Sequence, residues 1–231
     1  RPIILSPLLY AILVIVCSLA GCDWSSEPGG VYTPVEDLIF VDPVLRTCAV
    51  AEAARHGWKE SGRIEEMFCT NPEAAGIKNL AGLENLMNLE RLDLAHNAIS
   101  NISPIEHLTR LRQLALGYNL LSKVSINGLR ASLTELNLDH NKFSTVDWAS
   151  ELIRLTSLSF SYNSVTELTP LGSLVELRSL VAANNRIESI DPIGGLTMLE
   201  NVDFTENKIV DISVLRQLKQ MKIIEIAGNN I

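Results

Sequence analysis

Two histidines and two tyrosines are the side chains whose types and spacing could support chemistry. His96, Tyr118, His140 and Tyr162 follow one another at intervals of 22 residues. Exposed aromatic side chains often anchor protein interfaces. We expect the rings to form one outward-facing column on neighbouring strands about 4.8 Å apart, and hence a candidate recognition patch.

Catalytic motifs that would complete such a site are missing from the sequence. It has no G-x-S-x-G, no H-E-x-x-H, no P-loop and no dinucleotide fingerprint. We therefore expect a binding protein without a cofactor rather than an enzyme. Arg112 and Asp139 are expected to orient a polar ligand beside the rings. The candidate ligand-binding residues are His96, Arg112, Tyr118, Asp139, His140 and Tyr162.

Acidic and amide side chains occupy outward positions of the expected strands. They are Asp93, Asn137, Asp139, Asp203 and Glu225. A calcium site needs about six to eight converging oxygen ligands, so this scatter predicts a solvated acidic face and no metal site. The net charge of −8, without a cluster of Lys or Arg, argues against a nucleic-acid partner.

An asparagine also recurs every 22 residues, one position after the ring column, in segments of the form L-x-L-x-x-N-x-I. The seven are Asn97, Asn119, Asn141, Asn163, Asn185, Asn207 and Asn229. Two leucines at a period of two lie on one side of a strand, and stacked coils bury them together. The turn after each strand would bury unpaired backbone groups, which an asparagine amide can satisfy as donor and acceptor. We therefore expect a structural ladder rather than a binding site.

The segments LERLDLAHNAIS, LRQLALGYNLLS, LTELNLDHNKFS and their successors resemble the leucine-rich repeat family, specifically the 22-residue repeats of internalins. The resemblance covers seven units in residues 77–231. It implies an α/β repeat solenoid, a right-handed superhelix with a parallel concave sheet and short 3₁₀ or extended convex turns. It also implies a protein ligand on the concave face. Because His or Tyr before the ladder asparagine is common filler in this family, a filler role for the rings is the alternative to recognition.

Two places in the repeats depart from the common pattern. In SKVSINGLRASL the apolar residues Ile126 and Leu129 come one position early, which predicts an irregular convex turn. Phe160, Ala182 and Phe204 occupy one inward column in consecutive coils. This large–small–large order suggests that the alanine makes room for its aromatic neighbours.

Residues 1–21 have the order of a secretory signal peptide, with one basic residue, an apolar run and then small residues. A transmembrane anchor is the alternative, because the run approaches the about 20 residues that a spanning helix needs. The stretch LAGC, ending at Cys22, resembles the lipobox of bacterial lipoproteins. It implies that Cys22 carries a diacylglycerol and begins the mature protein. Asp23 resembles the enterobacterial signal for staying in the inner membrane.

Between the anchor and the repeats we expect a flexible tether over residues 22–34 and an N-terminal cap over residues 35–76. The tether is short, polar and rich in Gly, Pro and Ser. Within the cap, Asp42 followed by Pro43 predicts the start of a helix. The stretch RIEEMFCTN predicts a degenerate first strand.

The cap holds one pair of cysteines, Cys48 and Cys69. Cys17 leaves with the signal peptide and Cys22 is acylated, so this pair remains in an oxidising compartment. We expect a disulfide between them, with two buried free thiols as the alternative.

These features together predict a lipid-anchored, periplasm-facing protein of a bacterial cell envelope that works as a protein–protein interaction module. The inner membrane is slightly favoured over the outer membrane. The alternatives are the recognition domain of a larger enzyme or regulator whose effector part is missing, or an adhesin. The sequence begins at Arg1 and stops at Ile231, two residues after the last ladder asparagine, so we expect truncation at its ends.

Overall fold

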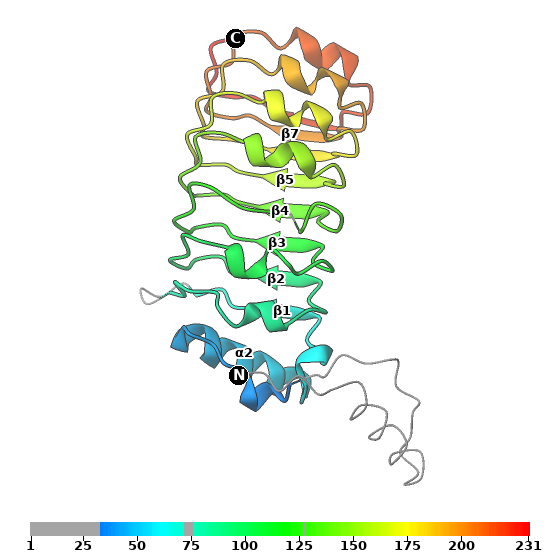
Figure 1. Ribbon diagram of the computed structural model, residues 1–231. Helices are drawn as coiled ribbons and strands as arrows, with labels where there is room; N and C mark the ends of the chain where they lie inside the picture. The colour runs from blue at the N-terminus through cyan, green and yellow to red at the C-terminus, as the bar shows by residue number, and fades with distance from the viewer. Residues whose placement is uncertain (1–32, 72–75, 127) are drawn as a thin grey trace, which may run out of the picture. The chain divides into compact units, whose positions relative to one another are not determined.

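The structure is a computed structural model that describes residues 33–71, 76–126 and 128–231. These residues form an N-terminal cap followed by stacked coils, each of which contributes one short strand (Figure 1). The expected signal peptide, Cys22, Asp23 and most of the expected tether lie outside the described residues.

One parallel sheet runs through all the coils, and its strands are in sequence order from β1 to β8. Neighbouring strands pair without a shift, so that Leu92 faces Leu114 and Leu158 faces Leu180. The strands are β1 (Glu66–Phe68), β2 (Arg91–Asp93), β3 (Gln113–Ala115), β4 (Glu135–Asn137), β5 (Ser157–Ser159), β6 (Ser179–Val181), β7 (Asn201–Asp203) and β8 (Ile223–Glu225). This arrangement confirms the predicted repeat fold.

The core lies between the sheet and the helical side of each coil. The middle residue of each strand from β1 to β7 is buried, whereas the first and third residues remain partly or fully exposed. This is the alternation that a strand with one buried face requires. Phe160, Ala182 and Phe204 are each 0% exposed, so the predicted inward column of large, small and large side chains is present.

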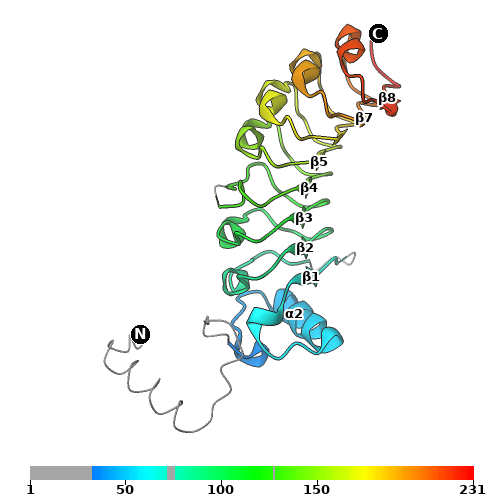
Figure 2. The same ribbon diagram turned by 90° about the vertical axis from the view of Figure 1, so that its right-hand side faces the viewer.

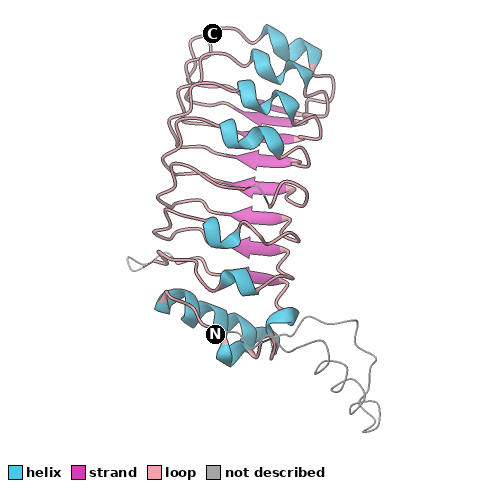
Figure 3. Cartoon of the chain, viewed as in Figure 1, coloured by secondary structure: helices cyan, strands magenta, loops and turns pink. Residues whose placement is uncertain are grey.

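Short 3₁₀ helices line the side of the coils opposite the strands (Figures 2 and 3). Pro104, Pro170 and Pro192 each stand in the first positions of such a helix, where the missing backbone N–H costs no hydrogen bond. The helices are η3 (Leu83–Asn85), η4 (Ser103–Ile105), η5 (Asp147–Glu151), η6 (Thr169–Ser173), η7 (Asp191–Gly195) and η8 (Ser213–Gln217).

The coil between β3 and β4 is irregular, as its displaced apolar residues predict. Its described residues form bends and turns rather than a 3₁₀ helix. Ile126 and Leu129 are buried at 6% and 0% exposure, so the chain bends to keep these side chains in the core.

The cap consists of η1 (Val35–Asp37), α2 (Pro43–His56) and η2 (Ser61–Arg63). Its β1 pairs with β2 as the first strand of the sheet. Asp42 is the N-cap of α2, and its Oδ1 accepts hydrogen bonds from the backbone N–H groups of Val44 and Leu45. Its Oδ2 accepts from Lys78 and Asn79 at 2.8 and 3.2 Å, so one carboxylate joins the cap helix to the start of the repeats.

Candidate functional site

The ladder asparagines are fully engaged in holding the coils together. The amide nitrogen of Asn119 donates to the carbonyl oxygen of Leu94 in the preceding coil and to those of Leu116 and Gly117 in its own. Its Oδ1 accepts from the N–H of Ile99 at 2.9 Å. The other six repeat this pattern with the equivalent residues of their coils. Their amide groups are therefore occupied by the backbone rather than available to a ligand.

The ring column lies in the turn after the strands, not on outward strand positions as we expected. His96 comes three residues after the end of β2, and Tyr118 comes three residues after the end of β3. The four ring residues have positive φ angles of 51° to 57°, in the left-handed region that non-glycine residues seldom adopt. This backbone conformation turns the chain out of the strand direction toward the ladder asparagine. The rings consequently lie along the edge of the sheet that is formed by the C-terminal ends of the strands, and not on its face.

The four rings form a continuous stack along that edge. The centroid distances are 4.1 Å from His96 to Tyr118, 3.9 Å from Tyr118 to His140 and 4.0 Å from His140 to Tyr162. The ring planes are within 14° of parallel. Tyr118 and Tyr162 are 46% and 51% exposed, so about half of each of these two residues is accessible to a partner.

Arg112 does not join this stack. It precedes β3, whereas Tyr118 follows that strand, so the two residues lie on opposite edges of the sheet. The Nε of Arg112 is 3.6 Å from an oxygen of Glu90. The length of the strand therefore separates the Arg112 guanidinium from the rings, although we expected both to contact one ligand.

Asp139 is engaged within the protein rather than oriented toward a ligand. Its Oδ1 accepts hydrogen bonds from the Ser159 hydroxyl at 2.5 Å and from the N–H of Ser161 at 2.6 Å. Its Oδ2 accepts from the side-chain amide of Asn137 at 3.0 Å. Because these bonds tie β4 to the next coil, we assign Asp139 a structural role.

A hollow of about 330 Å³ lies over β1 to β5, on a surface that we call the sheet face. The sheet face consists of the first and third residues of each strand and the residue two positions after the third. Phe68, Asp93, Ala115 and Glu135 line the hollow. The sequence interpretation missed the contribution of Phe68, which is 44% exposed. The available signal was its place in RIEEMFCTN, where a period of two directs Phe68 outward if Met67 is buried.

Charged pairs border the sheet face just before the strands. Glu200 accepts hydrogen bonds from Lys222 at 2.6 Å and from Arg178 at 2.8 Å. These bonds, with that from Lys222 the larger effect, hold the pKa of the Glu200 carboxyl below its ordinary value. One carboxylate is shared here by two cations, so this part of the border keeps a net charge of +1.

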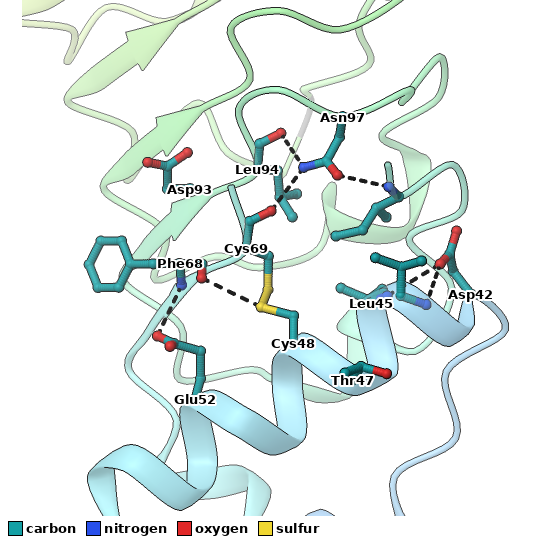
Figure 4. Close-up of a disulfide and its surroundings, with 12 residues drawn as sticks. Asp42, Leu45, Thr47, Cys48, Glu52, Phe68, Cys69, Asp93, Leu94 and Asn97 are labelled. Carbon is teal, nitrogen blue, oxygen red and sulfur yellow. Dashed lines mark hydrogen bonds between the residues drawn. A yellow bond between two sulfur atoms is a disulfide. The ribbon is translucent and has the colours of Figure 1, made fainter. Parts of the chain in front are cut away.

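Cys48 on α2 and Cys69 after β1 form a disulfide, with their Cα atoms 5.7 Å apart (Figure 4). Nearby, Glu52 is only 2% exposed, and its carboxylate accepts from the N–H of Phe68 at 3.3 Å and contacts Arg55 at 2.6 Å. The disulfide and Glu52 both connect the cap helix to the first strand. They fix the position of Phe68 at one end of the hollow.

Within the described ranges, no group of three or more His, Cys, Asp or Glu residues is arranged to hold a metal ion. In the same ranges, no helix has both the length and the apolar character needed to cross a membrane.

The fold and the ladder define a leucine-rich repeat solenoid. The protein-family model described as "Leucine Rich repeats (2 copies)" matches residues 88–130 and 153–195. A second family model, "Leucine Rich Repeat", matches residues 132–151. Leucine-rich repeat domains are generally protein–protein interaction modules. Among curated proteins, none matches this chain in sequence.

Two solved structures show the likeness in three dimensions. Internalin C2 from Listeria monocytogenes is 26% identical, with a TM-score of 0.62, over 86% of this chain and 99% of that one. An LRR protein of Leptospira interrogans is 23% identical, with a TM-score of 0.64, over 78% of this chain and 52% of that one. This chain therefore matches about half the length of the Leptospira protein.

Proposed function

We propose that this chain is a lipid-anchored bacterial envelope protein that binds a protein partner on its sheet face. The single observation that carries the proposal is the continuous outward surface of eight in-register strands. The ladder asparagines are occupied by the backbone, whereas many outward strand residues are free to vary without disturbing the core. The hollow over β1 to β5 gives this surface a concave region into which a side chain of the partner can pack, as the shape complementarity of a specific interface requires.

The anchoring part of the proposal depends on the sequence. Acylation of Cys22 would hold the protein at the membrane, because each buried methylene of a lipid chain contributes about 0.8 kcal/mol. A polar tether over residues 22–34, fully extended, would then place the start of the folded domain up to about 40 Å from the membrane. Asp23 favours retention at the inner membrane.

A second candidate function is recognition within a larger enzyme or regulator. The observation that favours it is the match to about half of the Leptospira protein, since such repeats occur inside longer chains. An adhesin would use the same sheet face toward an external partner. In each of these functions the repeat domain serves for binding.

A pull-down from an envelope extract tests the proposed binding face. We compare the wild-type protein with a Ser157→Tyr/Ser179→Tyr variant, in which two bulky uncharged rings cover the middle of the sheet face. These serines are register partners on β5 and β6. A partner that binds this face is recovered with the wild type and lost with the variant.

The matched control is Val175→Tyr/Thr197→Tyr. These two residues are exposed, are 22 positions apart like the serines, and lie on the turns that lead back to the strands. The control is expected to recover the partner as the wild type does. Equal recovery by all three proteins would place the binding site away from the sheet face.

A further inference from the structure

The sheet face carries most of the net negative charge of residues 33–231. The chain has 19 basic and 27 acidic residues, of which one and two precede residue 33, leaving 18 and 25 in residues 33–231. On the sheet face the only basic residue is Arg91. The acidic residues on it are Glu66, Asp93, Glu135, Asp139, Asp203 and Glu225. Five of the seven excess negative charges are therefore on this one surface.

The hollow in this face has Phe68 at one end, and its polar lining includes two carboxylates, Asp93 and Glu135, and one cation, Arg91. Phe68, Asp93, Ala115 and Asn137 stand side by side in register across β1 to β4. The short side chain of Ala115 leaves space between its neighbours, which gives the hollow its depth. Figure 4 shows Phe68 and Asp93 on adjacent strands. A long, flexible side chain from a partner would fit over the alanine.

In the described parts of the chain, Asp93 and Glu135 are left without an ion pair in the hollow, because Arg91, which also lines it, is paired with Glu66. One oxygen of Asp93 accepts from the N–H of Ala95 at 2.9 Å. One oxygen of Glu135 accepts from the side-chain amide of Gln113 at 3.0 Å. The second oxygen of each remains able to accept a hydrogen bond from a ligand.

We propose that the sheet face binds a basic segment of its protein partner, and that a lysine or arginine side chain of that segment enters the hollow. Asp93 and Glu135 accept charge-assisted hydrogen bonds from the cation, and the Phe68 ring contributes a cation–π contact. The remaining carboxylates attract the basic segment to the face and set its orientation. This inference rests on the proposed function, because it assigns the chemistry of the partner for the same face.

The direct test measures binding of a fluorescent twelve-residue peptide of alternating lysine and glycine. Wild-type protein is compared with Asp93→Asn/Glu135→Gln, which keeps the shape and the acceptor oxygens used within the protein. The control is Glu167→Gln/Glu188→Gln, two exposed carboxylates before η6 and η7. Both variants lose two negative charges, so nonspecific attraction falls equally in both.

We expect about a fivefold weaker affinity for Asp93→Asn/Glu135→Gln and less than about a twofold change for the control. Phe68→Leu is expected to weaken binding about twofold to fivefold, because leucine keeps apolar contact but has no aromatic face. Failure of the peptide to bind the wild type, or equal losses in the two charge variants, would overturn the inference.

The same charge variant separates this inference from the proposed function. If the natural partner is lost with Ser157→Tyr/Ser179→Tyr but retained fully with Asp93→Asn/Glu135→Gln, the sheet face binds a partner whose basic residues do not use the hollow. The proposed function then stands and the inference fails. Loss of the partner with both variants supports both.

Discussion

The rings of Tyr118 and His140 lie 3.9 Å apart between centroids and within 14° of parallel, although neither residue belongs to a strand. Their left-handed backbone conformation recurs at the same point of each coil, so the rings are brought into contact by the repeat itself. Aromatic contacts of this kind contribute about 0.5–1.5 kcal/mol beyond their buried area. The stack therefore supports the edge of the solenoid whether or not a partner uses it.

Replacing Asn163 by alanine should lower the free energy of unfolding by about 1–3 kcal/mol. The amide of Asn163 donates to carbonyls of two coils, and its Oδ1 accepts from Phe143 at 2.9 Å. The substitution leaves these buried backbone groups without partners. Chemical denaturation measures the effect, and Glu176→Ala on the exposed surface serves as the control. An unchanged denaturation midpoint in Asn163→Ala would contradict the structural role of the ladder.

Enlarging Ala182 to leucine should also destabilise the protein, by about 1–3 kcal/mol. Ala182 is completely buried in the column that holds Phe160 in the preceding coil and Phe204 in the next. Added methyl groups must displace one of these rings or the backbone. The measurement is the denaturation midpoint, with Ala131→Leu as an exposed control for the same change. Equal midpoints for the wild type and Ala182→Leu would mean that the column has spare volume.

The coils could be predicted from the sequence because their determinants repeat. Leu92 and its equivalents mark the buried side of each strand, and Asn97 and its equivalents mark the turn that follows. The displacement of Ile126 and Leu129 likewise revealed the irregular turn, since apolar residues out of phase must bend the chain to reach the core. These signals are local and each is read from residue type alone.

The candidate site was less predictable, because it depends on the φ angles of the turn residues and on the length of the strands. A strand of three residues ends before Tyr118, and nothing in the hydrophobic period reports the left-handed turn that carries the ring to the edge. Arg112 is close to Tyr118 in sequence, but the two residues lie at opposite ends of β3. The part played by Phe68 depends on the cap strand joining the sheet, and the cap follows the repeat pattern only loosely.

The carboxylate of Asp42 should make the free energy of unfolding depend on pH. Burial raises its pKa, but backbone hydrogen bonds from Lys78, Leu45, Asn79 and Val44 outweigh burial and hold the pKa below the ordinary value of 3.8. A lowered pKa in the folded state stabilises the fold above about pH 4, and this contribution is lost as pH falls through the folded-state value.

The matching variant is Asp42→Asn, which keeps one acceptor oxygen but replaces the other with a donor. It should cost about 1–3 kcal/mol near pH 7, because the N–H groups of Lys78 and Asn79 lose their acceptor. Urea denaturation of wild type and variant between pH 7 and pH 3 measures the difference. That difference should shrink below about pH 4. A constant difference over the whole range would show that the carboxylate charge has no part in the cap.

Acylation at Cys22 is tested in cells with labelled palmitate. The wild type should incorporate the label, and Cys22→Ala should accumulate as an unlipidated, uncleaved precursor because the acceptor sulfur is gone. Cys17→Ala is the matched control, since it lies in the same segment and should not affect labelling. Incorporation of palmitate into Cys22→Ala would reject the lipobox interpretation.

The role of the ring stack is tested by Tyr118→Ala/Tyr162→Ala. If the stack is a recognition stripe, this variant should lose the partner in the envelope pull-down while keeping the circular dichroism of the wild type, because both rings are about half exposed. Leu120→Ala/Val175→Ala removes two other exposed apolar side chains and serves as the control. Recovery of the same partner by wild type and the tyrosine variant would assign the rings to the filler role. In that case loss of stacking should still lower the denaturation midpoint, since each ring contact removed contributes about 0.5–1.5 kcal/mol to the edge of the solenoid.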